Sequence, residues 1–286
     1  MRRSRQLLPA LVAVACLLGG CTGAVILAAN VPAAFGPYSR IPDVAYGDQP
    51  RQTLDVYVPD VPVMSPPAVI IFIHGGGWDS GDKDWYRFVG SGLAEKGFVA
   101  VLPNYRLTPD VRFPVFVEDA ARAVAWTLRN AGNYGGDPQR VFIMGHSAGA
   151  HIAMLLALDA RYLAAAGVST DGIRGAVGLS GPYEFAIDSD LLRAVFGSAG
   201  DPRATQPIEF ARADAPPLLL IHGTDDRICL DRNSIALAGR VRKAGGQADL
   251  RLYPGVSHGE TVGGFSRLGR ARAPTLEDVA AFVAAH

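Results

Sequence analysis

The sequence predicts an α/β fold, in which a mostly parallel central β-sheet carries helices on both faces and a small lid is inserted late in the chain. Three observations favour it. Short apolar runs, typical of strands buried on both faces, alternate with longer segments of helical periodicity. A glycine-flanked serine at residues 145–149 stands between an apolar run and an apolar helix. A glycine-rich turn at residues 74–78 directly follows another apolar run.

Residues 43–286 are expected to form one domain, because a chain of 286 residues with 49% hydrophobic composition can bury a large core. The expected strands are 53–58, 69–73, 99–102, 140–144, 173–179, 218–221 and 249–252. The expected helices are 88–96, 115–129, 147–158, 234–244 and 276–285.

Charge and motif content exclude several classes of function. The 27 basic and 27 acidic residues balance, and the arginines are dispersed rather than gathered in a stripe, so nucleic acid is not an expected partner. No cluster of metal-ligand residues and no dinucleotide fingerprint is found, so neither a metal nor an organic cofactor is expected.

The N-terminus predicts export. Residues 1–20 combine a basic start, an apolar stretch and small residues, which is the pattern of a secretory signal peptide. Residues 18–21 resemble a bacterial lipobox, and this resemblance implies cleavage before Cys21, lipidation of its thiol and a membrane tether on the periplasmic or extracellular side. The mature chain would then lose three arginines and carry a net charge of 24 − 27 = −3.

An uncleaved anchor helix is the alternative, because apolar residues resume at 24–29. The glycines and Thr22 interrupt that stretch, which favours the lipoprotein. Residues 21–42 contain several prolines and are expected to form a tether or a packed N-terminal arm.

Ser147 is the candidate nucleophile. It occupies the centre of a G-x-S-x-G pattern that follows a strand and opens a helix, and a serine on such a bend projects its Oγ clear of the backbone. The helix that begins there directs its N-terminal dipole at the reaction centre.

The glycine-rich turn is a candidate oxyanion hole. Three glycines after a buried strand let the main chain approach a ligand and point N–H groups at it. We expect the N–H groups of Gly76, Gly77 and Ala148 to stabilise the negative charge that a carbonyl oxygen gains in acyl transfer.

His258 is the candidate base among six histidines. The others open the glycine turn, belong to the serine turn and its helix, end a strand or end the chain. His258 stands in a Pro/Gly-rich loop after a late strand, and an imidazole can take and return a proton near neutral pH. The acid that orients it is expected at Asp225 or Asp226, which follow the buried strand at 218–221.

These motifs resemble the α/β-hydrolase superfamily, and more narrowly the bacterial carboxylesterases related to hormone-sensitive lipase and to the feruloyl-esterase and kynurenine-formamidase group. The order serine, aspartate, histidine is that of α/β-hydrolases. The resemblance runs from about residue 43 to the C-terminus, through the segments 54–59, 74–78, 104–107, 145–151, 222–226 and 258–259.

The resemblance implies a serine carboxylesterase that hydrolyses small to medium esters through an acyl-enzyme. It maps the acid to Asp226. Cys229 and Leu230 stand where the family usually has Val and Pro, and formamidase-like members often have a bulkier residue at the position of Gly77. An arylformamidase with the same triad and, more distantly, a non-catalytic lipid-anchored binding protein are the alternatives.

Residues 181–216 interrupt the alternation of strands and helices with aromatic residues between Gly and Pro, and they are predicted to form the lid over this site. Trp78, Tyr105, Tyr183 and Phe185 are expected to line a pocket for the apolar part of the substrate. The alternative for each of these side chains is ordinary packing of the lid onto the sheet.

Overall fold

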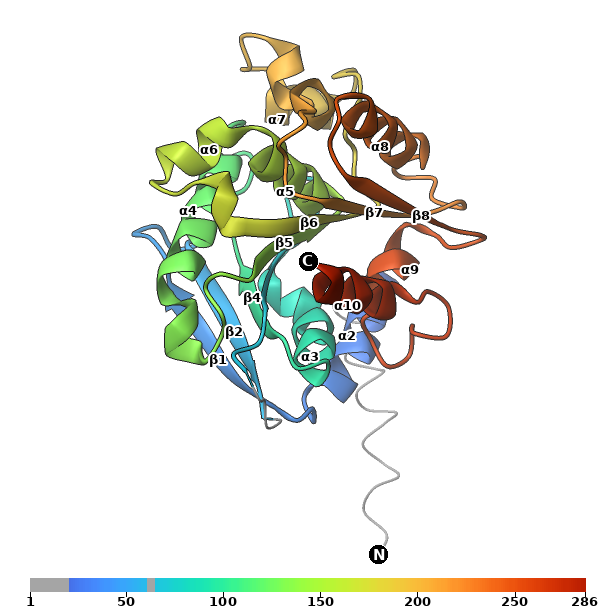
Figure 1. Cartoon of the computed structure of the whole chain (residues 1–286). Coiled ribbons are helices and arrows are strands. Elements are labelled where there is room, and N and C mark those ends of the chain that lie inside the picture. Colours follow the sequence, from blue (N-terminus) through green and yellow to red (C-terminus); the bar gives the residue numbers. More distant parts are fainter. Residues whose placement is uncertain (1–20, 61–64) are drawn as a thin grey trace, which may run out of the picture.

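The computed structural model describes residues 21–60 and 65–286, in which the strands form one sheet (Figure 1). The order is β1-β2-β4-β3-β5-β6-β7-β8, with β1 and β2 antiparallel and the pairs from β4 to β8 parallel. The strands are β1 (Tyr38–Ala45), β2 (Thr53–Pro59), β3 (Val69–Ile73), β4 (Val99–Pro103), β5 (Val141–His146), β6 (Ile173–Leu179), β7 (Leu218–Gly223) and β8 (Ala248–Tyr253).

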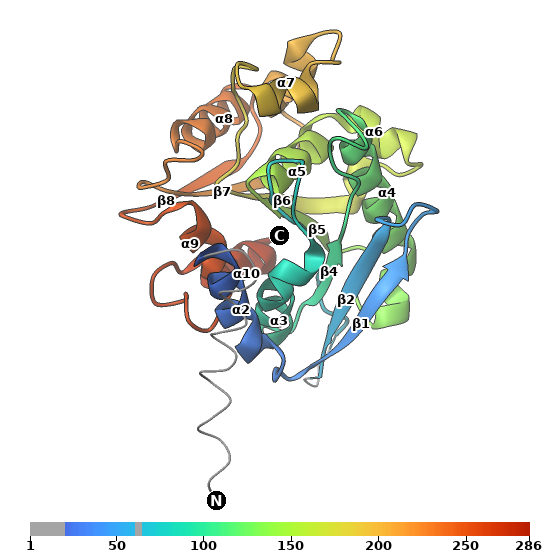
Figure 2. The ribbon, with the colours of Figure 1, turned by 180° about the vertical axis from the view of Figure 1, so that it is seen from behind.

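Helices cover both faces of the sheet, as Figures 1 and 2 show from opposite sides. One face carries α4 (Val115–Asn130), α5 (Ala148–Leu158), α6 (Ala160–Ala165), α7 (Asp190–Phe196) and α8 (Arg232–Lys243). The other face carries α2 (Cys21–Ala33), α3 (Arg87–Glu95), α9 (His258–Gly263) and α10 (Thr275–Ala285).

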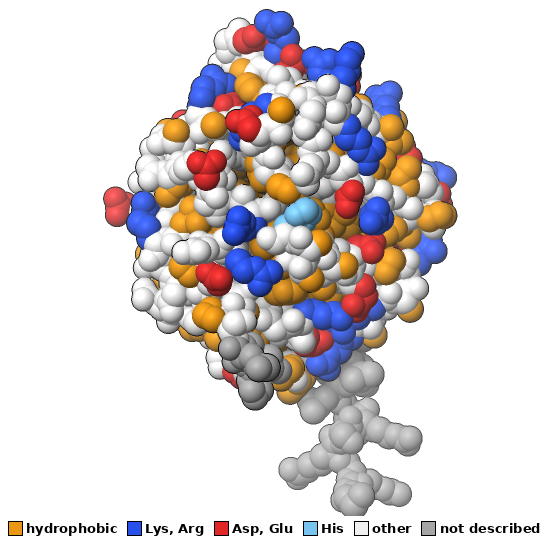
Figure 3. Space-filling model, in the orientation of Figure 1, with side chains coloured by type: hydrophobic (Ala, Val, Ile, Leu, Met, Phe, Trp, Pro, Cys, Tyr) orange, Lys and Arg blue, Asp and Glu red, His pale blue; other side chains and the backbone are white. Residues whose placement is uncertain are grey.

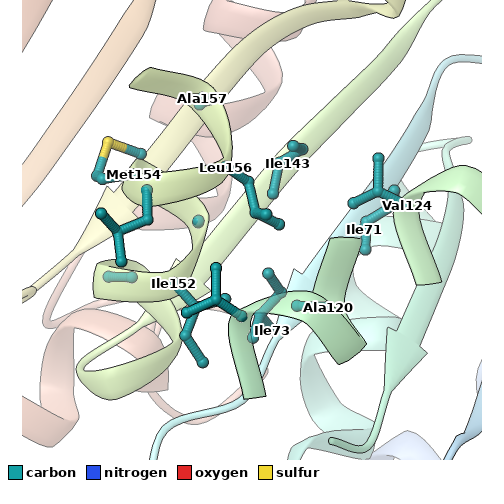
Figure 4. Close-up of a cluster of buried hydrophobic side chains, with 14 of the residues drawn as sticks. Ile71, Ile73, Ala120, Val124, Ile143, Ile152, Met154, Leu156 and Ala157 are labelled. Atoms are coloured by element: carbon teal, nitrogen blue, oxygen red, sulfur yellow. The ribbon is translucent and has the colours of Figure 1, made fainter. Parts of the chain in front are cut away.

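The sheet is sandwiched between two apolar layers because successive side chains of a strand point to opposite faces. In β3, Ile71 and Ile73 belong to the layer under α4 and α5, whereas Ile70 and Phe72 belong to the layer under α3 and α10. Figure 4 shows Ile152 of α5 beside the strand residues of the first layer. The predicted continuous apolar runs therefore mark strands that are buried on both faces.

The predicted α/β class, mostly parallel sheet and two-sided helix cover are confirmed, and each predicted strand lies within two residues of an observed one. The segment expected to be a tether or a packed N-terminal arm forms the helix α2, which packs on the body, and most of the edge strand β1. The Asn30 side chain fixes α2 to the body by donating to the carbonyls of Asp84 and Trp85 at 3.1 Å each. Residue 43, where the domain was expected to begin, lies within β1.

The signal-peptide prediction concerns residues 1–20, which lie outside the described residues. None of the helices in the described ranges has the length and apolar character that a bilayer span needs. On the face seen in Figure 3, basic and acidic side chains are interspersed.

Candidate active site

Parallel pairing brings the candidate residues to one edge of the sheet, the edge formed by the carboxyl ends of its parallel strands. Ile73 pairs with Gly145, His146 pairs with Leu179, and Leu179 pairs with Ile221. Because these parallel strands end at the same level, the segments that follow β3, β5 and β7 all emerge at this edge. They carry the glycine turn, Ser147 and Asp226 respectively. This is the edge at which open α/β sheets bind ligands.

Ser147 occupies a strained bend between β5 and α5. Its backbone has φ +54° and ψ −121°, outside the regions that a residue with a side chain ordinarily adopts. Its N–H donates to the carbonyl of Leu179 at 2.9 Å, which ties the bend to the end of β6. The strain is thus held by the neighbouring strand, and the side chain is left half-buried at the edge.

The flanking glycines are required by close backbone contacts. A Cβ on Gly145 would lie 2.1 Å from the Gly149 carbonyl oxygen, and a Cβ on Gly149 would lie 2.0 Å from that of Ile73. Both obstacles are main-chain atoms, which cannot rotate away. The second contact also shows that the start of α5 packs directly against the end of β3.

Gly149→Ala is expected to lower the free energy of unfolding by about 3 kcal/mol or more, because the added methyl group collides with backbone. Gly239→Ala in α8 is the matched control, since beyond its chain neighbours and the nearby backbone of its own helix no described atom lies within 4 Å of its Cβ position. That substitution should stabilise the chain by about 0.5–1 kcal/mol. Denaturant unfolding measures both, and equal stabilities of the two variants would contradict the steric argument.

The glycine turn has the backbone geometry of an anion-binding loop. Gly76 has φ +124° and Gly77 has φ +61°, and the Gly76 carbonyl accepts the N–H of Ser80 at 2.9 Å, which folds the loop back on itself. Within the described residues, no protein acceptor contacts the N–H groups of Gly76, Gly77 or Ala148. These are the three donors that the sequence predicts for the oxyanion hole.

The side chains of Asp226, after β7, and His258, after β8, contact each other at this edge. The His258 Nδ1 donates to Asp226 Oδ2 at 2.8 Å, and the Asp226 side chain is fully buried. Asp225, the other aspartate that the sequence left open, is exposed. The geometry therefore assigns the orienting carboxylate to Asp226.

Asp226 accepts three hydrogen bonds and also lies against the ring of His222. The N–H groups of Ile228 and Cys229 donate to Oδ1 at 3.0 and 2.9 Å, while His258 and His222 contact Oδ2 at 2.8 and 3.2 Å. Burial disfavours the charged form, but the hydrogen bonds from His222 and His258 outweigh it, so the pKa of Asp226 lies well below its usual range. The carboxylate is thus charged at any pH near neutrality.

His258 begins the helix α9 and does not lie in a loop as expected. Glu260 caps this helix by accepting the N–H and the Oγ–H of Ser257, both at 2.8 Å. The His258 carbonyl accepts Thr261 Oγ1 at 2.8 Å and the Nε2 of His146 at 3.0 Å. Helix capping therefore fixes the backbone that carries the His258 imidazole.

His146 links the serine turn to the base. It immediately precedes Ser147, and its ring centroid lies 4.8 Å from that of His258. Burial, followed by the nearby His258, lowers the pKa of His146 to about 3, so this ring is neutral near neutral pH. The Ser147 hydroxyl makes no hydrogen bond with the His258 ring in the described residues, and such contacts often tighten only when substrate binds.

An aromatic enclosure lies beside the glycine turn. Trp78 contacts His151, Phe185 and Phe196 at ring-centroid distances of 5.2, 6.1 and 4.9 Å. Phe185 and Phe196 come from the expected lid segment, and a Cβ built on Gly77 would lie 3.6 Å from Leu191 Cδ2 of α7. The segment 181–216 therefore reaches the glycine turn.

Tyr105 and Tyr183, which were expected to line the pocket, are both fully buried. Tyr105 is fully buried, stacks on His74 at 4.3 Å and donates to the His74 carbonyl at 3.0 Å. Tyr183 is also fully buried, and its N–H donates to Asn233 Oδ1 at 2.8 Å. Both side chains pack the protein interior, because a tyrosine without solvent access cannot line an open cleft.

Two histidines were not predicted to act at the site. His146 contacts the His258 carbonyl, and His222 contacts the Asp226 carboxylate. The available signals were their places in the chain, since one is the variable residue of G-x-S-x-G and the other stands four residues before the acid. Neither position in the sequence reveals these contacts, because they depend on how the strands are aligned in the sheet.

Comparison with known proteins defines the family. Residues 54–241 match the BD-FAE family model, and they include the glycine turn, Ser147 and Asp226. The chain belongs to the BD-FAE family. His258 lies beyond the matched segment.

Curated relatives of this BD-FAE chain are named as esterases. It is 35% identical, over 75% of its length, to a probable isoprenylcysteine alpha-carbonyl methylesterase of Oryza sativa subsp. japonica, and covers 57% of that protein. It is 32% identical, over 84% of its length, to esterase LipC of Mycobacterium tuberculosis, and covers 64% of it. The BD-FAE chain thus spans less than two thirds of the length of these relatives.

Solved structures share the fold. Esterase 2 of Thermogutta terrifontis aligns with a TM-score of 0.71 and 26% identity, covering 87% of the BD-FAE chain and 94% of its own. A truncated carbohydrate esterase from gut microbiota aligns with a TM-score of 0.74 and 24% identity, covering 87% and 97%. The predicted α/β-hydrolase fold is therefore confirmed.

Proposed function

We propose that this chain is a serine carboxylesterase that acts through an acyl-enzyme. The observation that carries the proposal is the 2.8 Å hydrogen bond between His258 Nδ1 and the buried carboxylate of Asp226, at the sheet edge where Ser147 stands on its strained bend. The esterase names of the relatives support the same class of reaction.

In the proposed reaction, His258 Nε2 takes the proton of Ser147 as its Oγ attacks the ester carbonyl carbon. The N–H groups of Gly76, Gly77 and Ala148 stabilise the oxyanion. His258 then returns the proton to the leaving alcohol, and water hydrolyses the acyl-enzyme by the reverse sequence. Asp226 keeps the imidazole in the tautomer with its proton on Nδ1 throughout.

The aromatic enclosure suggests the size of the acyl group. Trp78 is only 5% exposed and Phe196 only 1%, so these rings fill the volume beside the glycine turn and would leave little room for a long acyl chain. We expect acetyl to butyryl esters to be hydrolysed faster than long-chain esters. The groups in this mechanism are all supplied by the chain, with no metal-dependent or cofactor-dependent step.

The test is reaction with a fluorophosphonate probe, followed by steady-state hydrolysis of phenyl acetate and of N-formylkynurenine. Thermogutta terrifontis esterase 2 has been solved phosphonylated by sarin, so this reagent class suits the fold. We expect labelling of Ser147 and a higher kcat/KM for the ester. Labelling with a higher kcat/KM for the formamide would identify an arylformamidase, and an unlabelled chain would indicate a binding protein.

Export as a lipoprotein stays a prediction from residues 1–21. We propose that the enzyme acts from a lipid tether outside the cytoplasmic membrane, and only the lipobox-like sequence supports this. Cys21→Ser should release the protein from the membrane fraction, and a variant that stays membrane-bound would contradict lipidation at this residue.

A further inference from the structure

We propose that His222 is a positioning residue for the catalytic acid, and that a buried hydrogen-bond chain from Ser234 through His222 to Asp226 fixes the carboxylate that orients His258. This inference rests on the proposed function. It assigns a role to a buried histidine that the acyl-transfer steps do not use.

The contacts of His222 define the chain. The residue stands near the end of β7 and is fully buried. Its Nε2 lies 2.7 Å from the Cys229 carbonyl oxygen and 3.2 Å from Asp226 Oδ2, and its Nδ1 lies 2.8 Å from Ser234 Oγ of α8. Ser234 is fully buried as well.

These partners select one tautomer of His222. Both neighbours of Nε2 are oxygen acceptors, so Nε2 carries the proton. It donates this proton to the Cys229 carbonyl and faces Asp226 Oδ2 at 3.2 Å. Nδ1 is then the acceptor, and the only hydroxyl it contacts in the described residues is that of Ser234. The Ser234 hydroxyl therefore fixes the ring with its Nε2 beside Asp226 Oδ2.

The N–H of His222 completes the coordination of the carboxylate. Oδ1 is held by two backbone N–H groups of the turn, and Oδ2 by the side chains of His222 and His258. With donors on both oxygens, the carboxylate cannot rotate about its Cβ–Cγ bond. Loss of the His222 donor would leave Oδ2 with one partner, which increases both its negative charge and its freedom to move.

Other titratable groups around the ring do not change charge in the working pH range. Burial raises the pKa of the Cys229 thiol to about 12 and that of the Tyr183 phenol well above its ordinary value, and burial lowers the pKa of His146 to about 3. Arg232 at the start of α8 carries a permanent charge. A shift in the pH–rate profile therefore reports on the Asp226–His258 pair.

The test compares two amides at position 222. In His222→Gln the amide reaches the level of the ring Nε2 and can still donate to Asp226, whereas in His222→Asn it reaches only the level of Nδ1. We expect His222→Gln to keep kcat within about threefold of the parent and to leave the acid limb of kcat/KM unchanged. We expect His222→Asn to lower kcat about 10-fold or more, with KM within about twofold, because a hydrogen bond to a charged group is lost.

In His222→Asn, the acid limb of the pH profile of kcat/KM should also shift to higher pH by about half a pH unit or more. A carboxylate with one donor fewer attracts a proton on His258 more strongly, so the base is blocked up to a higher pH. A side chain with only a packing role would not move this limb. Equal kcat values and equal acid limbs in the two variants would overturn the inference.

The failure of this inference and the failure of the proposed function are distinguishable. A parent protein that neither hydrolyses phenyl acetate nor reacts with the fluorophosphonate probe contradicts the esterase, whereas an active parent with indistinguishable Asn and Gln variants contradicts only the role of His222. Thermal unfolding checks that both variants fold. If His222→Asn does not fold, Ser234→Ala removes only the hydroxyl that holds the His222 ring in place, and an acid limb identical to that of the parent then overturns the inference.

Discussion

Ser147→Ala is expected to lower kcat/KM for a nitrophenyl acetate by about 10⁴-fold or more, because nucleophile, base and acid act as one unit and the remaining donors only stabilise the oxyanion. The side chain lost is small and half-buried, so the fold should persist. Labelling by the fluorophosphonate probe should disappear in the same variant. Stopped-flow and steady-state assays at neutral pH measure the change.

Ser169→Ala is the matched control for the nucleophile. Ser169 is exposed and caps the turn just before β6, at the opposite edge of the sheet from Ser147. This variant should keep kcat/KM within about twofold of the parent, since surface substitutions are usually mild. A Ser147→Ala protein that retains activity within tenfold of the parent would rule out the acyl-enzyme mechanism.

Asp226→Asn is expected to lower kcat by about 10⁴-fold with a small change in KM. The amide oxygen can take the place of Oδ1 and still accept the N–H groups of Ile228 and Cys229. Its NH₂ group then faces His258 Nδ1 and turns that nitrogen into an acceptor, which places the imidazole proton on Nε2. A base protonated on Nε2 cannot accept the proton of Ser147.

Asp225→Asn is the control, because Asp225 is the adjacent carboxylate and is exposed. It should keep kcat within about threefold of the parent. Equal losses in the two variants would contradict the assignment of Asp226 as the orienting acid.

The depressed pKa of Asp226 also determines how its contribution varies with pH. A carboxylate whose folded pKa lies below its unfolded value of about 3.9 contributes its full stability above that unfolded value and loses it as the pH falls toward the folded pKa. The difference in free energy of unfolding between the parent and Asp226→Asn should therefore become smaller as the pH is lowered through this acidic range. Urea unfolding of both proteins measures this difference.

Much of the fold was predictable because local sequence reports burial directly. A run such as residues 69–73 has no polar face, so it is compatible only with a strand covered on both sides, and the structure places it at the centre of the sheet. The helix and edge strand within residues 21–45 were not predicted, because the prolines and small residues of this segment resemble a linker. Its helix and edge strand are stabilised by contacts with α3 and β2 that no local pattern contains.

By itself the sequence determined the fold class, the serine on its glycine-flanked bend and the glycine turn, because steric demands at such bends restrict the residues that can occupy them. The family resemblance pointed to Asp226, and the tertiary structure showed its contact with His258. Only the tertiary structure placed His258 at the start of a capped helix, showed Tyr105 and Tyr183 to be buried, and brought His146 and His222 against His258 and Asp226. The physical reason is that a hydrogen bond depends on distance and direction between atoms, and these follow from strand register and helix packing between segments far apart in the chain.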